Sequence, residues 1–128
     1  MRDHEKLRVF ALADELVLSV YRETASLPRS EQFGLTTQMR RAAVSITANI
    51  VEGCARSTHQ KYCRFLDIAY GSARELEYEM SVCIRLGYLS ETAGPTLLRQ
   101  CEHVSKSICS LLRALIKSSR PTFPHTGQ

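Results

Sequence analysis

The chain of 128 residues is long enough for one domain, and its 44% hydrophobic content can bury one modest core. No run of about 18 apolar residues occurs, and the first ten residues, MRDHEKLRVF, are charged, so we expect neither a membrane span nor a secretory signal and predict a cytoplasmic protein. Five cysteines, an odd number without paired CxxC spacing, predict free thiols rather than a disulfide framework.

Apolar residues recur at spacings of three and four along the chain, which predicts four helices. The first runs from about Asp3 to Ala25 and is ended by the segment LPRSEQFG, which contains Pro28. The second begins at Leu35 and ends near Gly53.

The third helix has the clearest end signals. Ser57 followed by Gln60 predicts a capping box, and Gly87 stands where a C-terminal cap glycine belongs. The fourth helix begins between Ser90 and Pro95, because proline is tolerated in the first turn of a helix.

Short connections make consecutive helices antiparallel neighbours, so the predicted fold is all-α, an up-down-up-down four-helix bundle over residues 1–118. Residues 119–128 have no periodicity and are predicted to form a disordered tail.

Catalytic signatures do not stand out in this sequence. We found neither a nucleophile with a positioned base nor a glycine-rich phosphate loop, so we expect a protein that is not an enzyme and needs no cofactor. One metal-binding alternative remains, because Cys54, His59 and Cys63 lie close in sequence. A surface histidine with two half-buried cysteines explains the same residues, and the prediction is no metal site.

A polar row lies beside the apolar stripe of the second predicted helix, formed by Arg41, Ser45, Asn49 and Glu52. Groups in that position are partly buried and need partners. A structural interpretation pairs Arg41 with Glu75 of the third helix, with hydrogen bonds from the row nearby. A functional interpretation makes the row part of a partner or ligand surface.

Gly71 lies in the middle of the third predicted helix. Glycine costs a helix about 1 kcal/mol relative to alanine, so we expect something to approach closely there. We expect the element that packs against Gly71 to be another helix, either within the bundle or from a second subunit.

Positive charge is concentrated in two blocks, residues 29–64 and 103–128, each with a net charge of +4. The second block contributes to a stripe on the fourth helix, opposite its apolar face, whose spacing suits a nucleic-acid backbone. The stripe consists of Arg99, Lys106, Arg113, Lys117 and Arg120. An ordinary solvent-facing helix surface is the competing interpretation, and no aromatic residue interleaves with these cations to stack on bases.

The segments QMRRAAVSITANIVEGCAR, FLDIAYGSARELEYEM and RLGYLS resemble the four-helix-bundle proteins first noticed as reading frames in intervening sequences of bacterial 23S ribosomal RNA genes. The likeness extends to about Ser118. That family is similar to the accessory variability determinant of diversity-generating retroelements, a basic homopentamer that binds nucleic acid and a reverse transcriptase. The resemblance therefore implies similar assembly and partners for this chain. The matching motif residues are Arg41, Ser45, Asn49, Glu52, Gly53, Arg56, Gly71, Ser72 and Glu75.

The sequence therefore suggests a non-enzymatic accessory protein that forms a ring-like homo-oligomer, a pentamer by resemblance, and binds structured RNA or DNA. Binding would use the fourth helix together with the corner formed by Arg56, Lys61 and Arg64. The alternative is an adaptor or scaffold that binds only proteins, for example a reverse transcriptase, through the polar row and the face around Gly71.

Overall fold

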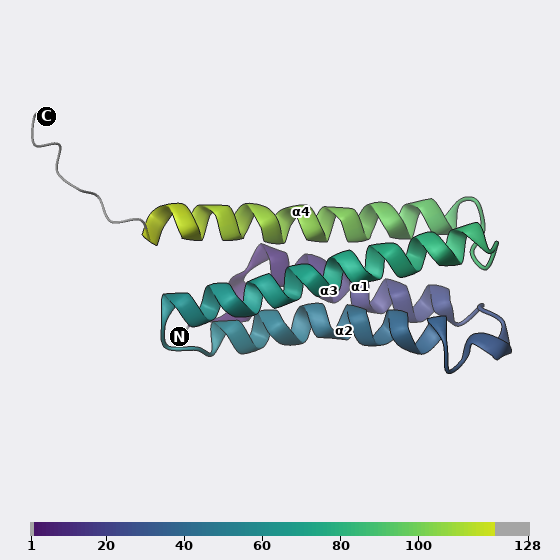
Figure 1. Ribbon diagram of the computed structural model, residues 1–128, viewed down its shortest axis with the longest axis horizontal. Helices are drawn as coiled ribbons and strands as arrows, with labels where there is room; N and C mark the ends of the chain where they lie inside the picture. The colour runs from purple at the N-terminus through teal and green to yellow at the C-terminus, as the bar shows by residue number, and fades with distance from the viewer. Residues whose placement is uncertain (1, 120–128) are drawn as a thin grey trace, which may run out of the picture.

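The computed structural model describes residues 2–119, and every regular element in that range is helical (Figure 1). The elements in order are η1 (His4–Lys6), α1 (Arg8–Thr24), η2 (Arg29–Glu31), α2 (Leu35–Cys54), α3 (His59–Arg85) and α4 (Ala93–Ser119). The prediction of an all-α protein with four helices is confirmed. Arg120 and the remainder of the predicted tail lie outside the described residues.

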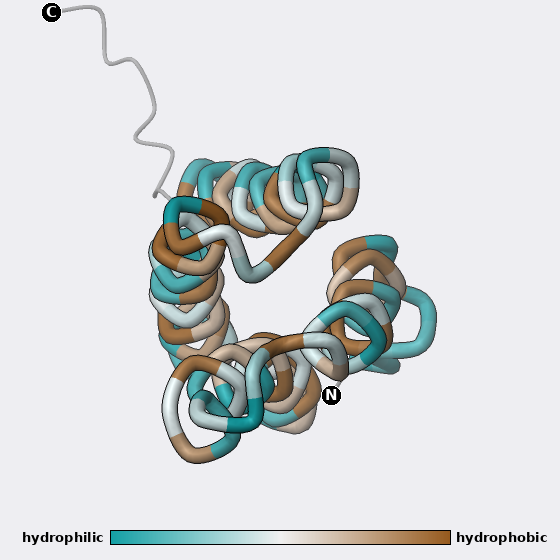
Figure 2. Tube along the Cα trace, turned by 90° about the vertical axis from the view of Figure 1, so that its right-hand side faces the viewer, coloured by the Kyte–Doolittle hydropathy of each residue, from teal (hydrophilic) through white to brown (hydrophobic). Residues whose placement is uncertain are grey.

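The four helices stand at the corners of a bundle when viewed along their axes (Figure 2). Each helix packs against its two neighbours, with α2 on α3, α3 on α4, and α1 on both α2 and α4, so that α1 and α3 lie diagonally opposite. His59 at the start of α3 contacts Leu115 near the end of α4, while Ala73 in the middle of α3 contacts Cys101.

The core is filled by the apolar stripes that the periodicity predicts, because each helix turns one such face toward the other three. Burial is complete for the central residues of the stripes. They include Ala13, Leu16, Val20, Met39, Ile46, Ile50, Leu66, Leu76, Met80, Cys101 and Ile108.

Two predicted helix starts differ from the structure. The first helix begins at Arg8 rather than near Asp3, because Leu7 is extended and Asp3 caps the separate η1 turn through a bond from the backbone N–H of Glu5. In α3 the N-cap is Thr58 rather than Ser57, and its hydroxyl accepts from the backbone N–H of Lys61 at 3.2 Å.

The predicted ends near α4 are confirmed. Gly87 has φ of +74°, and the backbone N–H of Tyr88 reaches back to the carbonyl of Cys83 at 3.0 Å, which closes α3. The next helix starts at Ala93, whose N–H is capped by the Ser90 hydroxyl at 2.9 Å. Pro95 therefore falls in the first turn, where it removes no helical hydrogen bond.

Gly53, buried in the last turn of α2, lies close against α3. A methyl group added at Gly53 would lie 2.9 Å from Cβ of Phe65 and 3.4 Å from a ring carbon of Tyr62. Since the Phe65 Cβ is fixed to the backbone, it cannot move aside cheaply.

Replacing Gly53 with alanine should therefore destabilise the fold by about 1–3 kcal/mol, although alanine is the better helix former. Urea unfolding at fixed protein concentration measures this. Ala48→Gly, at an exposed position on the same helix, calibrates the propensity term of about 1 kcal/mol. A Gly53→Ala protein at least as stable as the wild type would contradict the close packing.

One carboxylate is buried on α3. Glu79 is only 5% exposed, and its Oε1 has no hydrogen-bond partner among residues 2–119. Burial, together with the charge of the neighbouring Glu75 and a hydrogen bond to it, raises the pKa of Glu79 to about 7.

The raised pKa makes stability depend on pH. Below the ordinary carboxylate pKa, Glu79 is protonated in the folded and the unfolded chain, so folding buries no charge there. Above about pH 7 it is ionised in both states, and folding must bury the charged carboxylate. The free energy of unfolding should fall between about pH 4.5 and pH 7 by up to about 3 kcal/mol. Glu79→Gln should remove most of that slope, and an unchanged slope would show that Glu79 is not its source.

Candidate nucleic-acid interface

The cationic stripe on α4 is exposed over its described length. Arg99, Lys106, Arg113 and Lys117 all lie on the solvent side of the helix, while Arg120 falls beyond the described residues. Leu97, Val104 and Ile108 occupy the opposite, buried face. The predicted separation of charge from core on this helix is therefore confirmed.

A polar pocket of about 440 Å³ lies between α3 and α4, beside this stripe. Lys106 and Arg113 of α4 line it together with Arg74 of α3, which sequence reasoning did not select. Tyr70 lines the same pocket and is half-buried. An aromatic ring therefore does lie among these cations, contrary to the prediction, because it comes from the neighbouring helix. The pocket is lined by Tyr70, Arg74, Glu77, Glu102, Ser105, Lys106, Cys109, Ser110 and Arg113.

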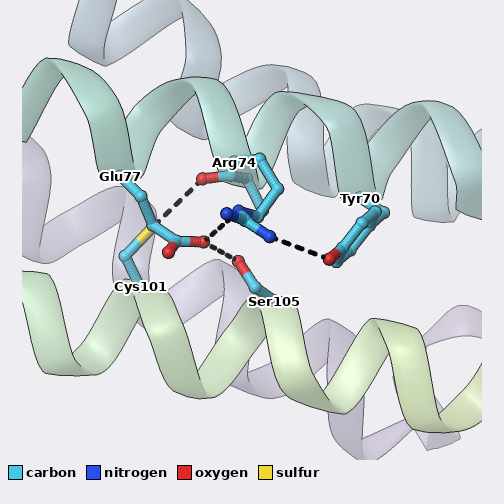
Figure 3. Close-up of polar contacts among 6 residues, drawn as sticks. Tyr70, Arg74, Glu77, Cys101 and Ser105 are labelled. Atoms are coloured by element: carbon cyan, nitrogen blue, oxygen red, sulfur yellow. Dashed lines mark hydrogen bonds and ion pairs between the residues drawn. The ribbon is translucent and has the colours of Figure 1, made fainter.

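Hydrogen bonds hold the α3 side of the pocket in place (Figure 3). The Arg74 guanidinium lies between two groups of its own helix: its Nη1 donates to the Tyr70 hydroxyl at 3.1 Å, and its Nε is 3.4 Å from Oε2 of Glu77. The same carboxylate oxygen accepts a hydrogen bond from the Ser105 hydroxyl of α4. Glu77 thus joins the two helices and fixes one end of Arg74.

Cys101 of α4 is buried and serves the packing of α4 on α3. Its thiol donates to the carbonyl oxygen of Ala73 at 3.5 Å (Figure 3). Burial, with smaller contributions from the charges of Glu77 and Glu102, raises the pKa of this thiol far above its ordinary value. It remains protonated at neutral pH.

The second predicted basic group lies at the corner between α2 and α3, where Lys61 and Arg64 are exposed. Arg56 is tied back to its own helix: its Nη2 is 3.2 Å from Oε1 of Glu52, and its guanidinium lies 5.3 Å from the centroid of the Phe65 ring. Lys61 and Arg64 are therefore the freer cations of this corner.

The two basic groups lie at the same end of the bundle. His59 of α3 makes a 3.0 Å hydrogen-bond contact between its Nε2 and the carbonyl oxygen of Leu115 in the last turns of α4. This contact holds the start of α3, which carries Lys61, beside the part of α4 that carries Lys117.

In the polar row of α2, Ser45 and Asn49 are hydrogen-bonded, whereas Arg41 is exposed. Ser45 serves the packing of α2 on α3, because its hydroxyl lies 2.9 Å from that of Ser72. Asn49 is bonded within α2 itself, where its Nδ2 donates to the Ser45 carbonyl at 2.8 Å. The expected bridge between Arg41 and Glu75 does not form among residues 2–119, and both residues are exposed. Water solvates their charges there, so little is gained by pairing them.

Gly71 faces outward on α3. A methyl group added there would have no neighbour within 4 Å among residues 2–119, so the expected close approach of a helix from the same bundle is wrong. The other alternative, a helix from a second subunit packing against Gly71, stays a prediction.

The metal-binding alternative is not supported either. Among residues 2–119, no group of three or more His, Cys, Asp and Glu side chains is placed to hold a metal ion. Cys54 is buried, which raises the pKa of its thiol, and His59 is engaged with the Leu115 carbonyl. All five cysteines are free thiols, as predicted. No helix within the described range is long and apolar enough to cross a membrane.

Comparison with known proteins places this arrangement in a family. The bundle resembles a crystal structure of a protein of unknown function from the S23 ribosomal protein family of Bacteroides thetaiotaomicron, with a TM-score of 0.74 and 22% identity over 82% of this chain and 98% of the other. No curated protein matches. The model of the 23S rRNA-intervening sequence protein family matches residues 5–110. The chain therefore belongs to the family of 23S rRNA-intervening sequence proteins.

Proposed function

We propose that this protein is a non-enzymatic accessory factor that binds structured RNA or DNA in the cytoplasm. It would act as a ring-like homo-oligomer of antiparallel, up-down-up-down bundles. The observation that carries the proposal is the convergence of Arg74, Lys106 and Arg113 with Tyr70 around one polar pocket. The family name, which refers to ribosomal RNA, agrees with an RNA ligand.

The charges of this face suit a phosphate backbone. Glu77 is neutralised by Arg74 and hydrogen-bonded by Ser105, so it repels an approaching phosphate less than a free carboxylate would. Lys117 extends the cationic line beyond the pocket, toward the end of α4. Attraction of this kind is independent of sequence and is driven by counterion release. If five copies assemble, as the resemblance implies, their +4 charges sum to about +20, so weak contacts per subunit add up.

The buried thiols support a non-enzymatic role. Burial raises the pKa of Cys83 to about 11, and it raises the pKa of Cys54 and Cys101 as well. Thiols that stay protonated at neutral pH are poor nucleophiles. Their positions between packed helices give them a structural use.

Charge reversal on α4 should weaken binding without unfolding the protein. We expect Arg113→Glu/Lys117→Glu to lower the affinity for a structured RNA by at least about tenfold at about 50 mM salt, and to flatten the salt dependence. Fluorescence anisotropy with labelled RNA and duplex DNA measures both effects.

The matched control for that experiment is Arg22→Glu/Arg29→Glu, which changes the net charge equally on exposed residues of α1 and η2. Its affinity should change much less. Equal losses in both variants would indicate a general charge effect, and an unchanged affinity of the α4 variant would contradict the assignment of this face.

A variant of Tyr70 tests whether the protein binds unpaired bases as well as the phosphate backbone. Removing its ring with Tyr70→Ala should cost about 1–3 kcal/mol with an RNA that contains an unpaired loop, because stacking is lost, and little with duplex DNA. Tyr70→Phe keeps the ring and loses only the hydrogen bond to Arg74. If Tyr70→Ala weakened both ligands equally, Tyr70 would have no stacking role.

The alternative function is an adaptor that binds only a protein, for which a reverse transcriptase is the candidate suggested by resemblance. The exposed apolar residues Ile68 and Tyr78 on α3 favour this alternative. Salt separates the two functions, since an apolar contact resists salt whereas phosphate binding collapses. A complex with a protein partner that survives about 200 mM salt, with no nucleic-acid binding at about 50 mM, would support the adaptor.

A further inference from the structure

Two apolar surfaces of the bundle have no cover within the described chain. The first is the outer α3 stripe, which lies on the side of α3 that faces away from the core. Ile68 and Tyr78 in it are 44% and 65% exposed, and Glu75 is exposed between them. The outer α3 stripe consists of Ile68, Gly71, Glu75, Tyr78 and Val82.

Gly71 in this stripe meets no close neighbour among residues 2–119 that would require a glycine. It sits in mid-helix at φ below zero, where alanine would fit freely and improve helix stability by up to about 1 kcal/mol. A small residue on an exposed helix face allows another backbone to approach closely. The position therefore indicates a contact with something outside the subunit.

The second surface is the α1/α4 groove, of about 450 Å³. Its lining is apolar at Leu7, Val9, Leu12 and Leu111. Cationic and ionisable groups stand in it as well, at Arg8, Lys106 and His103, and no carboxylate lines it.

We propose that the outer α3 stripe of one copy packs into the α1/α4 groove of the next copy. This inference rests on the proposed homo-oligomer and specifies its interface. Ile68 or Tyr78 would fill the apolar lining, Glu75 would meet Arg8, and Gly71 would let the helices approach. The stripe from Ile68 to Val82 spans about 21 Å of helix and the α4 side of the groove, His103 to Leu111, about 12 Å, so the groove would take part of the stripe.

Charge favours this pairing over a contact between two identical stripes. Two outer α3 stripes packed on each other would bring Glu75 of both copies into one apolar interface, where like charges repel. The α1/α4 groove offers cations instead.

The two surfaces lie on different sides of the bundle, because α1 and α3 occupy opposite corners (Figure 2). A head-to-tail contact of this kind repeats from copy to copy and closes into a ring when the rotation permits. Each subunit then uses one stripe and one groove.

The first test is Gly71→Gln, which adds an uncharged side chain and improves the helix. The isolated subunit should become more stable, yet the mass measured by light scattering should fall from that of an oligomer to the 14.4 kDa of one chain. Ala114→Gln, at an exposed position of α4, is the matched control and should keep the wild-type mass. A Gly71→Gln protein with the wild-type mass would overturn the proposal.

The second test mixes two variants. Arg8→Glu reverses an exposed groove charge and leaves the outer α3 stripe intact, whereas Gly71→Gln leaves the groove intact. Each should be monomeric alone. An equimolar mixture should form a dimer of twice 14.4 kDa and nothing larger, because only one intact stripe and one intact groove are available per pair. A mixture that stays monomeric would contradict the pairing.

These outcomes are separable from those of the proposed function. A wild-type protein that is monomeric but binds RNA would refute the interface and leave the nucleic-acid role standing. If both variants kept the mass of the wild-type oligomer, the protein would still be an oligomer but this interface would be refuted. An apolar peptide or RNA that occupied the groove without changing the mass of the assembly would also overturn the proposal.

Discussion

The close packing of α2 on α3 is the constraint on which the other features depend. Gly53 lets the end of α2 lie against Tyr62 and Phe65, and the Ser45–Ser72 contact holds the middle of the two helices together. With α2 on one flank and α4 on the other, α3 has one outward side left. That side carries Gly71, whose missing side chain is explained by no contact among residues 2–119.

The opposite flank of α3 sets up the candidate interface. Glu77 reaches both Arg74 of its own helix and Ser105 of α4, so one carboxylate links the helices and orients a guanidinium. Glu79, two residues along, is buried and lacks a partner for one oxygen within residues 2–119. The two glutamates of α3 thus differ in cost, because Glu77 has an arginine and a hydroxyl as partners whereas Oε1 of Glu79 has none among residues 2–119.

The sequence predicted what depends on periodicity and on local caps. Spacing of apolar residues located the four helices and their buried faces, and the φ of Gly87 follows from the need for a left-handed residue after α3. Helix starts were predicted less well, since Leu7 adopts an extended conformation that no local signal marks.

Side-chain pairing was the part that the sequence did not determine. A helical wheel places Arg41 and Glu75 on facing sides but not at the height and exposure that would favour an ion pair. Arg74 was missed because its position depends on Tyr70 and Glu77 together, and the role of Glu77 becomes visible only when Ser105 of α4 is beside it. The available signal was the position of Arg74 in the sequence, four residues after Tyr70 and three before Glu77, which places all three on one face of a helix.

The most direct test of the account is the slope of log affinity for a structured RNA against log salt, measured for the wild type and for the Gly71→Gln protein. One subunit can neutralise only about four phosphates with its α3/α4 face, so its slope should be no steeper than about −4. The account predicts a steeper slope for the wild type, because several subunits act together. No binding at low salt, or a slope near zero, would contradict nucleic-acid binding through this face.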